Sequence, residues 1–471
     1  MRSRNSFGRR QFAGGAGQCD GRPDAGVVRY PFLHASMPET RRLRRRLPPA
    51  EARALSPRQE QQDIALLRSH DADQFPVQAI GAGAKLKLSM KSALATACLL
   101  FAALPVSAQD SKYEVPDPQE IPVALMVDLS SGQTLFARDP DRRFMPASVT
   151  KVMTTFLAFE LIDAGEIDLA QIFTMSSNAY DDWHRVGSTM FLDENARITV
   201  DQLLHGITTV SANDGSVVLA EGAAGSVDAW TKMMNAKAAE IGMRDSRFYS
   251  PNGFPDEGRT FVSANDLVRL ASALIKRHPE KFRHFIGQEG YEYNGIAQVN
   301  HDPLIGRVEG ADGIKTGFTN DAGYTYLGTA QRGPRRLAMV VAGADRASIR
   351  NRAAISFMEW GFDAFESRRL FENDEVIAQA RLQDADAEIM PLKAAGPLRV
   401  TIPKGSNPDI SLSLSYEGPL RAPVEKGEKV AELDISIDGM EPFSVPLFAA
   451  KAAEKASFLQ RISNGISSLF T

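Results

Sequence analysis

The chain has 471 residues, and its 54 Lys and Arg against 58 Asp and Glu give a formal net charge of −4. At roughly 100–200 residues per domain, this length indicates two to four globular domains. Hydrophobic residues make up 43% and charged residues 24%, which argues against a collagen, a coiled coil, a disordered chain or a multi-span membrane protein. Residues 1–89 carry 16 basic and 8 acidic groups, so the rest carries 38 and 50, a net charge of −12 that argues against nucleic acid as a partner.

Residues 1–89 are rich in arginine, as in the run RRLRRR at 41–46, and show no hydrophobic periodicity. A basic arm of this kind can bind nucleic acid. We favour the plainer interpretation that translation starts at Met90 and that residues 1–89 are no part of the mature protein. The residues after Met90 favour it, because they have the order expected at the start of an exported chain.

Residues 90–108 read MKSALATACLLFAALPVSA. The basic Lys91, an apolar run and a small-residue end at Ala108 are the three parts of a secretory signal peptide. The apolar run is too short for a permanent membrane span, which needs about 20 residues; the alternative is a buried core helix. Cleavage after Ala108 would remove Cys19 and Cys98, the two cysteines of the chain, so a disulfide scaffold, a Cys-ligated metal site and a Cys nucleophile are not expected.

Residues 109–366 have the mixed pattern of an α/β or α+β domain. Apolar residues at helical spacing follow Pro146, which favours a first helical turn, and Gly165 ends the pattern. Two apolar runs on either side of Gly333-Pro334 predict a hairpin. The predicted strands are 123–128, 133–137, 324–330 and 337–343, and the predicted helices are 146–164, 200–204, 217–223, 227–240 and 347–360.

Residues 367–449 alternate apolar and polar positions between glycines and prolines, which predicts a small all-β domain with strands at 398–402, 410–414, 429–437 and 443–447. Residues 450–471 predict a C-terminal amphipathic helix. Its apolar face consists of Phe458, Leu459, Ile462, Ile466, Leu469 and Phe470. Such a helix can lie in a membrane interface. We favour this over a helix docked on the protein itself, because the stretch follows a completed β domain.

Ser148-Val149-Thr150-Lys151 is the only S-x-x-K in the chain and lies in the first turn after Pro146. Side chains three residues apart share a helix face, so the hydroxyl and the amine can meet. Unpaired N–H groups at a helix start favour an oxyanion and a lowered lysine pKa. A neutral lysine could then take the serine proton and make the serine a nucleophile. The ordinary alternative is a surface Ser and Lys.

Ser211-Ala212-Asn213 follows in a short polar break between apolar segments. A second hydroxyl can relay a proton, and an Asn amide can hold a substrate carbonyl or a lysine. Alone, the triplet would more often be a helix N-cap.

Lys315-Thr316-Gly317, the only K-T-G, lies on a predicted strand before the hairpin. The Lys charge and the Thr hydroxyl can bind a carboxylate, and the glycine lets an extended peptide approach the strand. The ordinary alternative is a plain strand end.

The three motifs together, in this order, resemble the signatures of class A β-lactamases and penicillin-binding proteins. Over about residues 115–471 the layout resembles the low-molecular-mass penicillin-binding proteins, specifically the serine-type D-alanyl-D-alanine carboxypeptidases. The β-rich domain and the amphipathic tail are similar to that family's C-terminal parts. The expected fold is therefore a β-lactamase/transpeptidase-like catalytic domain of α/β (α+β) class, a small all-β domain and a C-terminal amphipathic helix.

The resemblance implies a role for each motif residue. Ser148 would attack the D-Ala-D-Ala carbonyl with Lys151 as base, Ser211 and Asn213 would relay protons and hold the substrate, and Lys315, Thr316 and Gly317 would bind the terminal carboxylate side. The backbone N–H groups of Ser148 and Phe318 would form the oxyanion hole. Phe318 stands where some relatives carry His, so no side-chain role is carried over to it. Arg350 aligns with a carboxylate-binding Arg of relatives; Arg346, Arg352 and a solvated helix face are the alternatives.

The resemblance implies no cofactor and no metal. It implies the peptidoglycan stem peptide and β-lactam antibiotics as partners, no nucleic acid, and a periplasmic enzyme attached peripherally to the inner-membrane surface by its C-terminal helix. The expected reaction removes the terminal D-alanine from pentapeptides through an acyl-enzyme on Ser148.

Four alternatives stay open at this point. A D,D-endopeptidase that cuts cross-links would use the same residues. A β-lactamase is less favoured, because no E-x-x-x-N lies between Ser211 and Lys315. A non-catalytic penicillin sensor would be expected to lack the Ser or the Lys. A Ser-His-Asp hydrolase would need a G-x-S-x-G-like elbow. The histidines at 184, 205, 278, 284 and 301 show no motif context, and we expect them to be structural or surface residues.

Overall fold

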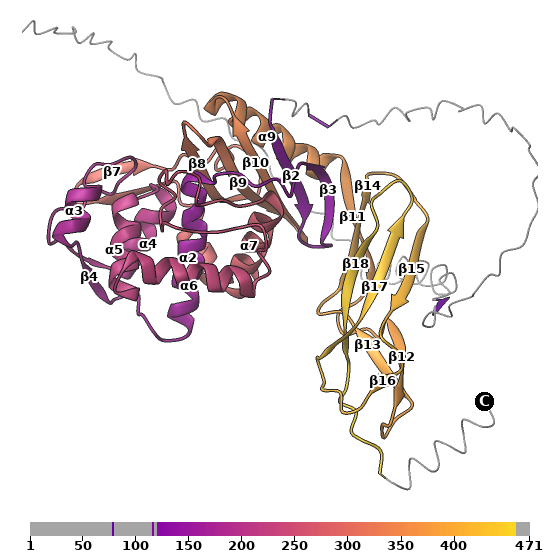
Figure 1. Cartoon of the computed structure of the whole chain (residues 1–471). Helices are drawn as coiled ribbons and strands as arrows, with labels where there is room; N and C mark the ends of the chain where they lie inside the picture. The colour runs from indigo at the N-terminus through magenta and orange to yellow at the C-terminus, as the bar shows by residue number, and fades with distance from the viewer. Residues whose placement is uncertain (1–77, 80–114, 117–119, 458–471) are drawn as a thin grey trace, which may run out of the picture. The chain divides into compact units, whose positions relative to one another are not determined.

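The computed structural model describes residues 78–79, 115–116 and 120–457 (Figure 1). The predicted signal peptide at 90–108 and the apolar face from Phe458 to Phe470 lie outside these residues. A two-residue strand, β1 (Gln78–Ala79), pairs in parallel with a strand of the C-terminal part. Among the described residues, none of the helices has both the length and the apolar character needed to cross a membrane.

A five-stranded antiparallel sheet forms the frame of the first part, in the order β3-β2-β10-β9-β8. Two of its strands precede the helical region in the sequence and three follow it, so the chain returns to the sheet that it started (Figure 1). The predicted strands and the hairpin are confirmed to within a few residues. The strands are β2 (Val123–Asp128), β3 (Gln133–Arg138), β8 (Ala311–Thr319), β9 (Gly323–Arg332) and β10 (Arg335–Ala344).

Strand β2 lies between β3 and β10 and is buried on both faces, which explains its run of apolar residues from Val123 to Val127. Val123 and Leu125 belong to one hydrophobic core, together with the residues of α2. Ala124 and Met126 alternate with them and belong to a second core, together with the apolar residues of α9. The sheet therefore lies between two helical layers, as in a mixed α/β domain.

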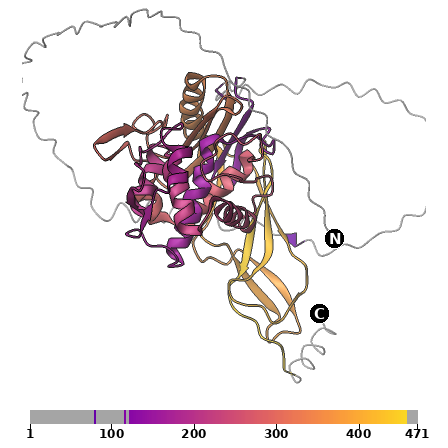
Figure 2. The ribbon, with the colours of Figure 1, turned by 60° about the vertical axis from the view of Figure 1, so that its left-hand side comes forward.

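Helices and short hairpins fill the region between β3 and β8 (Figure 2). The helices, with the one that follows the sheet, are η1 (Ala147–Thr150), α2 (Lys151–Asp163), α3 (Ser177–Trp183), α4 (Val200–Thr209), α5 (Asn213–Ala224), α6 (Val227–Glu240), α7 (Ala264–Arg277), α8 (Pro279–Phe285) and α9 (Ala347–Asp363). The short strands are β4 (Ile172–Thr174), β5 (Arg197–Thr199), β6 (Gly290–Tyr293) and β7 (Ile296–Val299).

The single helix predicted over 146–164 consists of two pieces. A 3₁₀ turn, η1, precedes the α-helix α2, which starts at Lys151. Ala147 has a positive φ of 49°, a conformation that costs energy for a residue with a Cβ. This constraint sits directly before Ser148. The helix predicted over 217–223 in fact starts at Asn213, so that residue begins a helix and does not lie in a loop.

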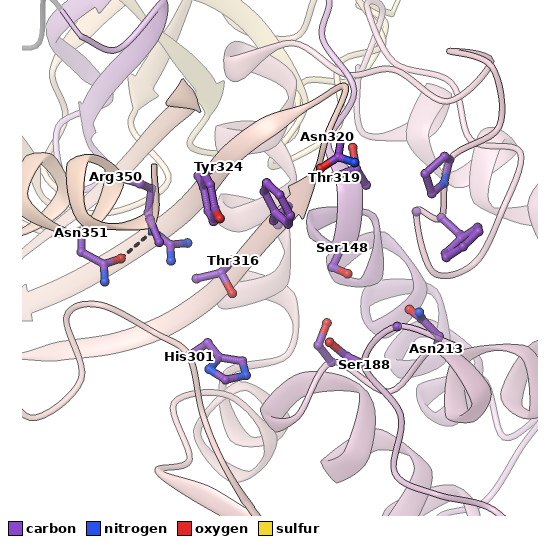
Figure 3. A pocket seen from close by; sticks show the side chains of 18 residues that line it. Ser148, Ser188, Asn213, His301, Thr316, Thr319, Asn320, Tyr324, Arg350 and Asn351 are labelled. Carbon is purple, nitrogen blue, oxygen red and sulfur yellow. Dashed lines mark hydrogen bonds between the residues drawn. The ribbon is translucent and has the colours of Figure 1, made fainter. Parts of the chain in front are cut away.

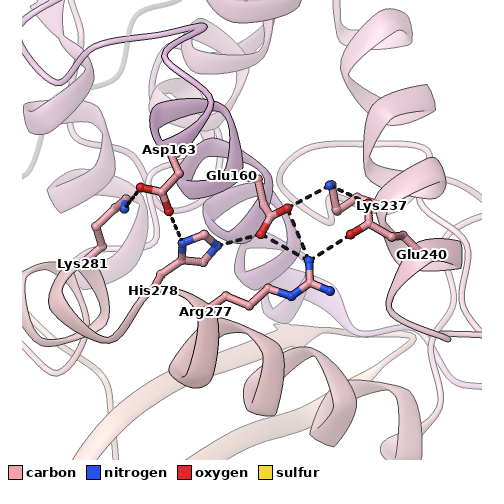
Figure 4. A network of polar contacts seen from close by, with 7 residues as sticks. All are labelled: Glu160, Asp163, Lys237, Glu240, Arg277, His278 and Lys281. Atoms are coloured by element: carbon pink, nitrogen blue, oxygen red, sulfur yellow. Dashed lines mark hydrogen bonds and ion pairs between the residues drawn. The ribbon is translucent and has the colours of Figure 1, made fainter. Parts of the chain in front are cut away.

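The opposite end of α2 is held by a network of charged side chains (Figure 4). His278 is buried, and its Nδ1 and Nε2 lie 2.6 Å from Asp163 Oδ2 and 3.0 Å from Glu160 Oε1. Lys237 Nζ lies 2.8 Å from the second Glu160 oxygen, and Arg277 adds a longer contact to the same carboxylate. The network joins α2 to the helices α6, α7 and α8.

The C-terminal part is all β, as predicted, with its own hydrophobic core. Its main sheet has the order β1-β15-β17-β18-β13-β12-β16, and β11 pairs with β14. The strands are β11 (Phe365–Phe371), β12 (Ala378–Gln383), β13 (Ile389–Lys393), β14 (Leu398–Pro403), β15 (Ile410–Ser415), β16 (Leu420–Arg421), β17 (Lys429–Ile437) and β18 (Phe443–Ala449). Residues 450–457, assigned by the sequence analysis to the amphipathic helix, are not helical, and Ala453 pairs with Val424.

Candidate active site

Ser148 and Lys151 meet at the junction of η1 and α2. Lys151 Nζ lies 3.0 Å from Ser148 Oγ, as the three-residue spacing predicts. Ser148 lines a cavity of about 690 Å³, whereas Lys151 is only 1% exposed. The alternative of a surface Ser and Lys is therefore wrong. Lys151 is not among the residues that line the cavity.

The environment of Lys151 lowers the pKa of its amine well below the usual value, because burial disfavours the charged form and the Lys315 cation adds to this. Asp214 acts in the opposite direction. Two fixed acceptors orient the amine: Asn213 Oδ1 at 2.8 Å and the backbone carbonyl of Asn252 at 2.7 Å. A neutral amine can donate to both and still direct its lone pair at the serine hydroxyl.

Asn213 connects Lys151 to the opposite wall of the cavity. Its Nδ2 donates to the Val186 carbonyl at 2.9 Å, while its Oδ1 accepts from the lysine. Ser211 also lines the cavity and has a positive φ of 65°. Neither residue is an N-cap, since Ala212 occupies that position of α5 without a side-chain cap. Figure 3 shows Asn213 and Ser188 on one side of Ser148, with Thr316 on the other.

Asp214, the residue after Asn213, fixes the loop that forms this wall. Its carboxylate accepts from the backbone N–H groups of Met190 at 3.0 Å and Leu192 at 3.1 Å. Burial raises the pKa of Asp214 in spite of these hydrogen bonds. Gly187 and Ser188, just before that segment, line the cavity. The sequence alone predicts no role for Asp214, because a single Asp at a helix start has many ordinary explanations.

The K-T-G segment lies on β8, and its three residues differ in their position relative to the cavity. Thr316 and Gly317 line the cavity, but Lys315 does not. Lys315 is buried behind the wall, and its Nζ donates to the Thr316 carbonyl at 3.0 Å. Burial lowers its pKa to about 8, with Asp302 opposing the shift and Arg350 adding to it. Lys315 thus supplies positive charge from behind and does not line the surface that a ligand would meet.

The structure gives a different reason for a glycine at position 317 from the one inferred from the sequence. A Cβ at this position would lie 2.5 Å from the Pro146 carbonyl oxygen and 3.3 Å from Ala147 Cβ. The glycine therefore lets β8 pack directly against the turn that carries the nucleophile. Gly253 has the same function on another side, since its Cβ would lie 1.9 Å from the Ala147 carbonyl oxygen.

Phe318 and Arg350 also line the cavity. The Phe318 ring is 48% exposed and stacks on Tyr324, with ring centroids 4.1 Å apart. Arg350 is buried in α9 and donates to the Thr325 carbonyl at 3.2 Å and to Asn351 Oδ1 at 2.6 Å. The structure thus favours Arg350 over the exposed Arg346 and Arg352, neither of which lines the cavity.

His301 lines the cavity too, beside Thr316 (Figure 3). From the sequence, His301 is expected to be a structural or surface residue, so its place in the cavity lining is a correction. Burial and the positive charges of Lys315 and Arg350 lower its pKa. Asn252 is the other residue that sequence reasoning missed, because it acts through its backbone carbonyl, which no side-chain pattern reveals.

The assembled groups can carry out acyl transfer: an activated hydroxyl, a buried amine beside it and cationic groups that can hold an anion across the cavity.

Comparisons with known proteins agree with this chemistry. The sequence pattern of the family described as D-alanyl-D-alanine carboxypeptidase matches residues 114–346. That of the penicillin-binding protein 5 C-terminal domain matches residues 365–455. The chain is 30% identical over 367 residues to the D-alanyl-D-alanine carboxypeptidase DacF of Bacillus subtilis, covering 77% of this chain and 93% of that one. It is 28% identical over 391 residues to DacA of Escherichia coli K12, covering 82% and 96%.

Solved structures give the same result. Penicillin binding protein 5 from Haemophilus influenzae superposes with a TM-score of 0.64 at 29% identity, covering 72% of this chain and 100% of that one. Penicillin binding protein 6B from Escherichia coli superposes with a TM-score of 0.56 at 28% identity, covering 71% and 97%. Both the sequence and the fold therefore relate this chain to the same group of proteins.

Proposed function

This chain belongs to the D-alanyl-D-alanine carboxypeptidase family of low-molecular-mass penicillin-binding proteins, and from that membership we propose how its residues carry out the reaction. The chain is a serine-type D-Ala-D-Ala carboxypeptidase: it hydrolyses the bond before the terminal D-alanine of a peptidoglycan stem peptide. The observation that carries the proposed mechanism is the 3.0 Å contact between Ser148 Oγ and Lys151 Nζ at the base of the cavity.

Acylation starts when the neutral Lys151 amine takes the proton of the Ser148 hydroxyl. The serine oxygen then attacks the carbonyl between the two D-Ala residues, and the negative charge develops on the carbonyl oxygen. The backbone N–H groups of Ser148 and Phe318 are the proposed donors to this oxyanion. Asn213 and the Asn252 carbonyl keep the lysine in place throughout the step.

The terminal carboxylate of the substrate is proposed to bind at Thr316 and Arg350, which line the cavity on the side of β8 and α9. Lys315 adds positive charge behind Thr316. Gly317 keeps β8 close to Ser148, which fixes the distance between this anchor and the nucleophile. The anchor explains why the enzyme would act at the end of a peptide, since a terminal D-alanine presents its free α-carboxylate one residue beyond the bond that is cleaved.

Collapse of the tetrahedral intermediate breaks the C–N bond, and the leaving amine takes a proton relayed by Ser211 from the protonated Lys151. Water then attacks the acyl-Ser148 ester, with the same lysine as base. A β-lactam carries a carboxylate and a strained amide, so it is proposed to bind the same groups and acylate Ser148. The mechanism requires no metal and no cofactor.

We also propose the cellular setting from the sequence. Residues 90–108 act as the export signal, residues 1–89 are absent from the mature protein, and the enzyme works in the periplasm. Residues 109–366 are the catalytic domain and residues 367–449 the β domain. The amphipathic face from Phe458 to Phe470 attaches the enzyme peripherally to the inner membrane.

The test uses the full chain and a Ser148→Ala variant. Both are incubated with a pentapeptide muropeptide and with a D-Ala-D-Ala cross-linked dimer, and the products are followed by mass. Loss of one alanine from the pentapeptide, absent in the variant, is the expected result. Cleavage of the dimer alone would assign the endopeptidase activity instead. Intact penicillin labelling of Ser148 without turnover of either substrate would refute the catalytic mechanism.

A further inference from the structure

A second group of ionisable side chains lies outside the cavity, between α4 and α8. Asp201 and His205 are four residues apart on α4 and therefore share a helix face. His284 comes from α8. One potential ligand atom from each of the three side chains lies within 4.8 Å of the other two. The sequence showed no such site, because His205 and His284 are far apart in the chain.

The three side chains point toward one another, but His284 and Asp201 do not form a hydrogen bond. His284 Nε2 lies 3.6 Å from Asp201 Oδ1, which is longer than a hydrogen bond. A tetrahedral zinc ion with bonds of about 2.0–2.2 Å places neighbouring ligand atoms roughly 3.3–3.5 Å apart. Small side-chain rotations would therefore bring all three atoms to one ion. The side chains of His284 and Asp201 are 59% and 40% exposed, so an ion can enter from solvent.

Packing restricts the ring that lies deepest in the group. The His205 ring stacks on Tyr291, with centroids 5.6 Å apart and an interplanar angle of 16°. It also contacts the rings of Phe285 and His284, at 4.8 Å and 5.1 Å. The ring is therefore held in one place by its aromatic neighbours.

We propose that Asp201, His205 and His284 form a binding site for a late first-row divalent cation, with Zn²⁺ as the principal candidate. Two imidazoles and one carboxylate suit zinc, nickel, cobalt or copper and not magnesium or calcium. Water would complete the coordination. Thr208 Oγ1 already joins the two helices by donating to the Phe285 carbonyl at 2.8 Å. The ion would add a second link between α8 and the helix that leads to Ser211.

The test titrates the metal-free full chain, without an affinity tag, with ZnCl₂ and separately with MgCl₂ in a calorimeter. Cobalt titration, followed by its visible absorption, reports the coordination geometry. The expected result is zinc binding at one such site, no magnesium binding, and at least tenfold weaker zinc binding in His205→Ala and in His284→Gln. His184→Ala is the matched control: His184 lies outside the group, with its ring centroid 4.4 Å from that of Tyr180, and its loss should leave zinc binding unchanged.

Circular dichroism of the metal-free variants shows whether they are folded. If His205→Ala does not fold, His284→Gln still tests the proposal, because His284 is exposed and its replacement should not disturb the fold. Equal zinc affinity in the wild type and in His284→Gln would place the ion elsewhere, for example on Cys19 or Cys98, and would overturn the proposal. Absence of zinc binding by the wild type would overturn it as well.

Discussion

The two buried lysines of the active site must be in opposite protonation states, although burial lowers the pKa of both. Lys151 must lose its proton to act as base. Lys315 must keep its proton if its charge is to hold a carboxylate. The structure separates the two roles by position: Lys151 contacts Ser148, whereas Lys315 stands behind Thr316. Their mutual repulsion helps Lys151 to become neutral first.

This difference predicts the alkaline limb of the pH profile. The pKa of Lys315 is about 8, so its positive charge is present below that pH and lost above it. We expect kcat/KM for a pentapeptide to fall roughly tenfold for each pH unit above about 8. A pH series of initial rates measures this. The matched control is a substrate whose terminal carboxylate is amidated; its slower turnover should lack the falling limb. An equal fall of kcat/KM above about pH 8 with both substrates would argue against carboxylate binding by the Lys315 charge.

At the scale of elements, the contact of β8 with η1 determines where the nucleophile lies. We expect Gly317→Ala to push β8 away from the Pro146 carbonyl, because the new Cβ would lie 2.5 Å from that oxygen. A displacement of this kind can cost about 10- to 100-fold in the acylation rate. Stopped-flow acylation by a fluorescent penicillin measures it. Gly396→Ala is the control, since no atom lies within 4 Å of its added Cβ. An unchanged rate in Gly317→Ala would contradict the assignment.

The charged network at the far end of α2 predicts a pH-dependent stability. Burial of Glu160 opposes its ionisation, but the Lys237 hydrogen bond and the nearby positive charges outweigh this and lower its pKa. The stabilisation is therefore complete above the unfolded pKa of about 4.3 and is lost as the pH falls through the lower folded value. We expect Glu160→Gln to reduce the free energy of unfolding at pH 7 by on the order of 2 kcal/mol.

Urea unfolding at pH 7 and at successively lower pH measures this effect. The difference between Glu160→Gln and the wild type should shrink as the pH falls below about 4. Glu280→Gln serves as the control, because the Glu280 side chain is 86% exposed and its pairing with Arg283 lies on the surface. A difference that stays constant with pH would mean that packing, and not the charge of Glu160, is responsible.

At the scale of the whole molecule, the sequence predicted the two structured parts and the three motifs, because these depend on local patterns. The strand over 123–128 and the helix over 227–240 have the predicted bounds. The contacts that complete the site depend on chain segments that meet only in the fold. The contact of the Asn252 carbonyl, the hydrogen bonds of Asp214 to its loop, and the position of His301 could not be predicted, since no local sequence pattern shows which segments meet.

The C-terminal residues 458–471 give a prediction for the whole enzyme. Deletion of 458–471 leaves residues 450–457 in their contacts with the β domain, including the pairing of Ala453 with Val424. We expect the shortened enzyme to keep its carboxypeptidase activity and to lose its binding to anionic phospholipid vesicles. Vesicle sedimentation measures binding, and pentapeptide turnover serves as the control for folding. Equal sedimentation of both proteins would locate the membrane contact elsewhere.

The cavity combines groups from η1, α5, β8 and α9, which lie between Ser148 and Arg350 in the sequence. A polypeptide that has formed η1 and α5 but not yet added β8 and α9 has the nucleophile without the carboxylate anchor. Covalent labelling by a fluorescent penicillin therefore counts finished molecules. In a refolding or secretion experiment, the labelled fraction would record how many chains have completed the catalytic domain, a quantity that helix content alone overstates.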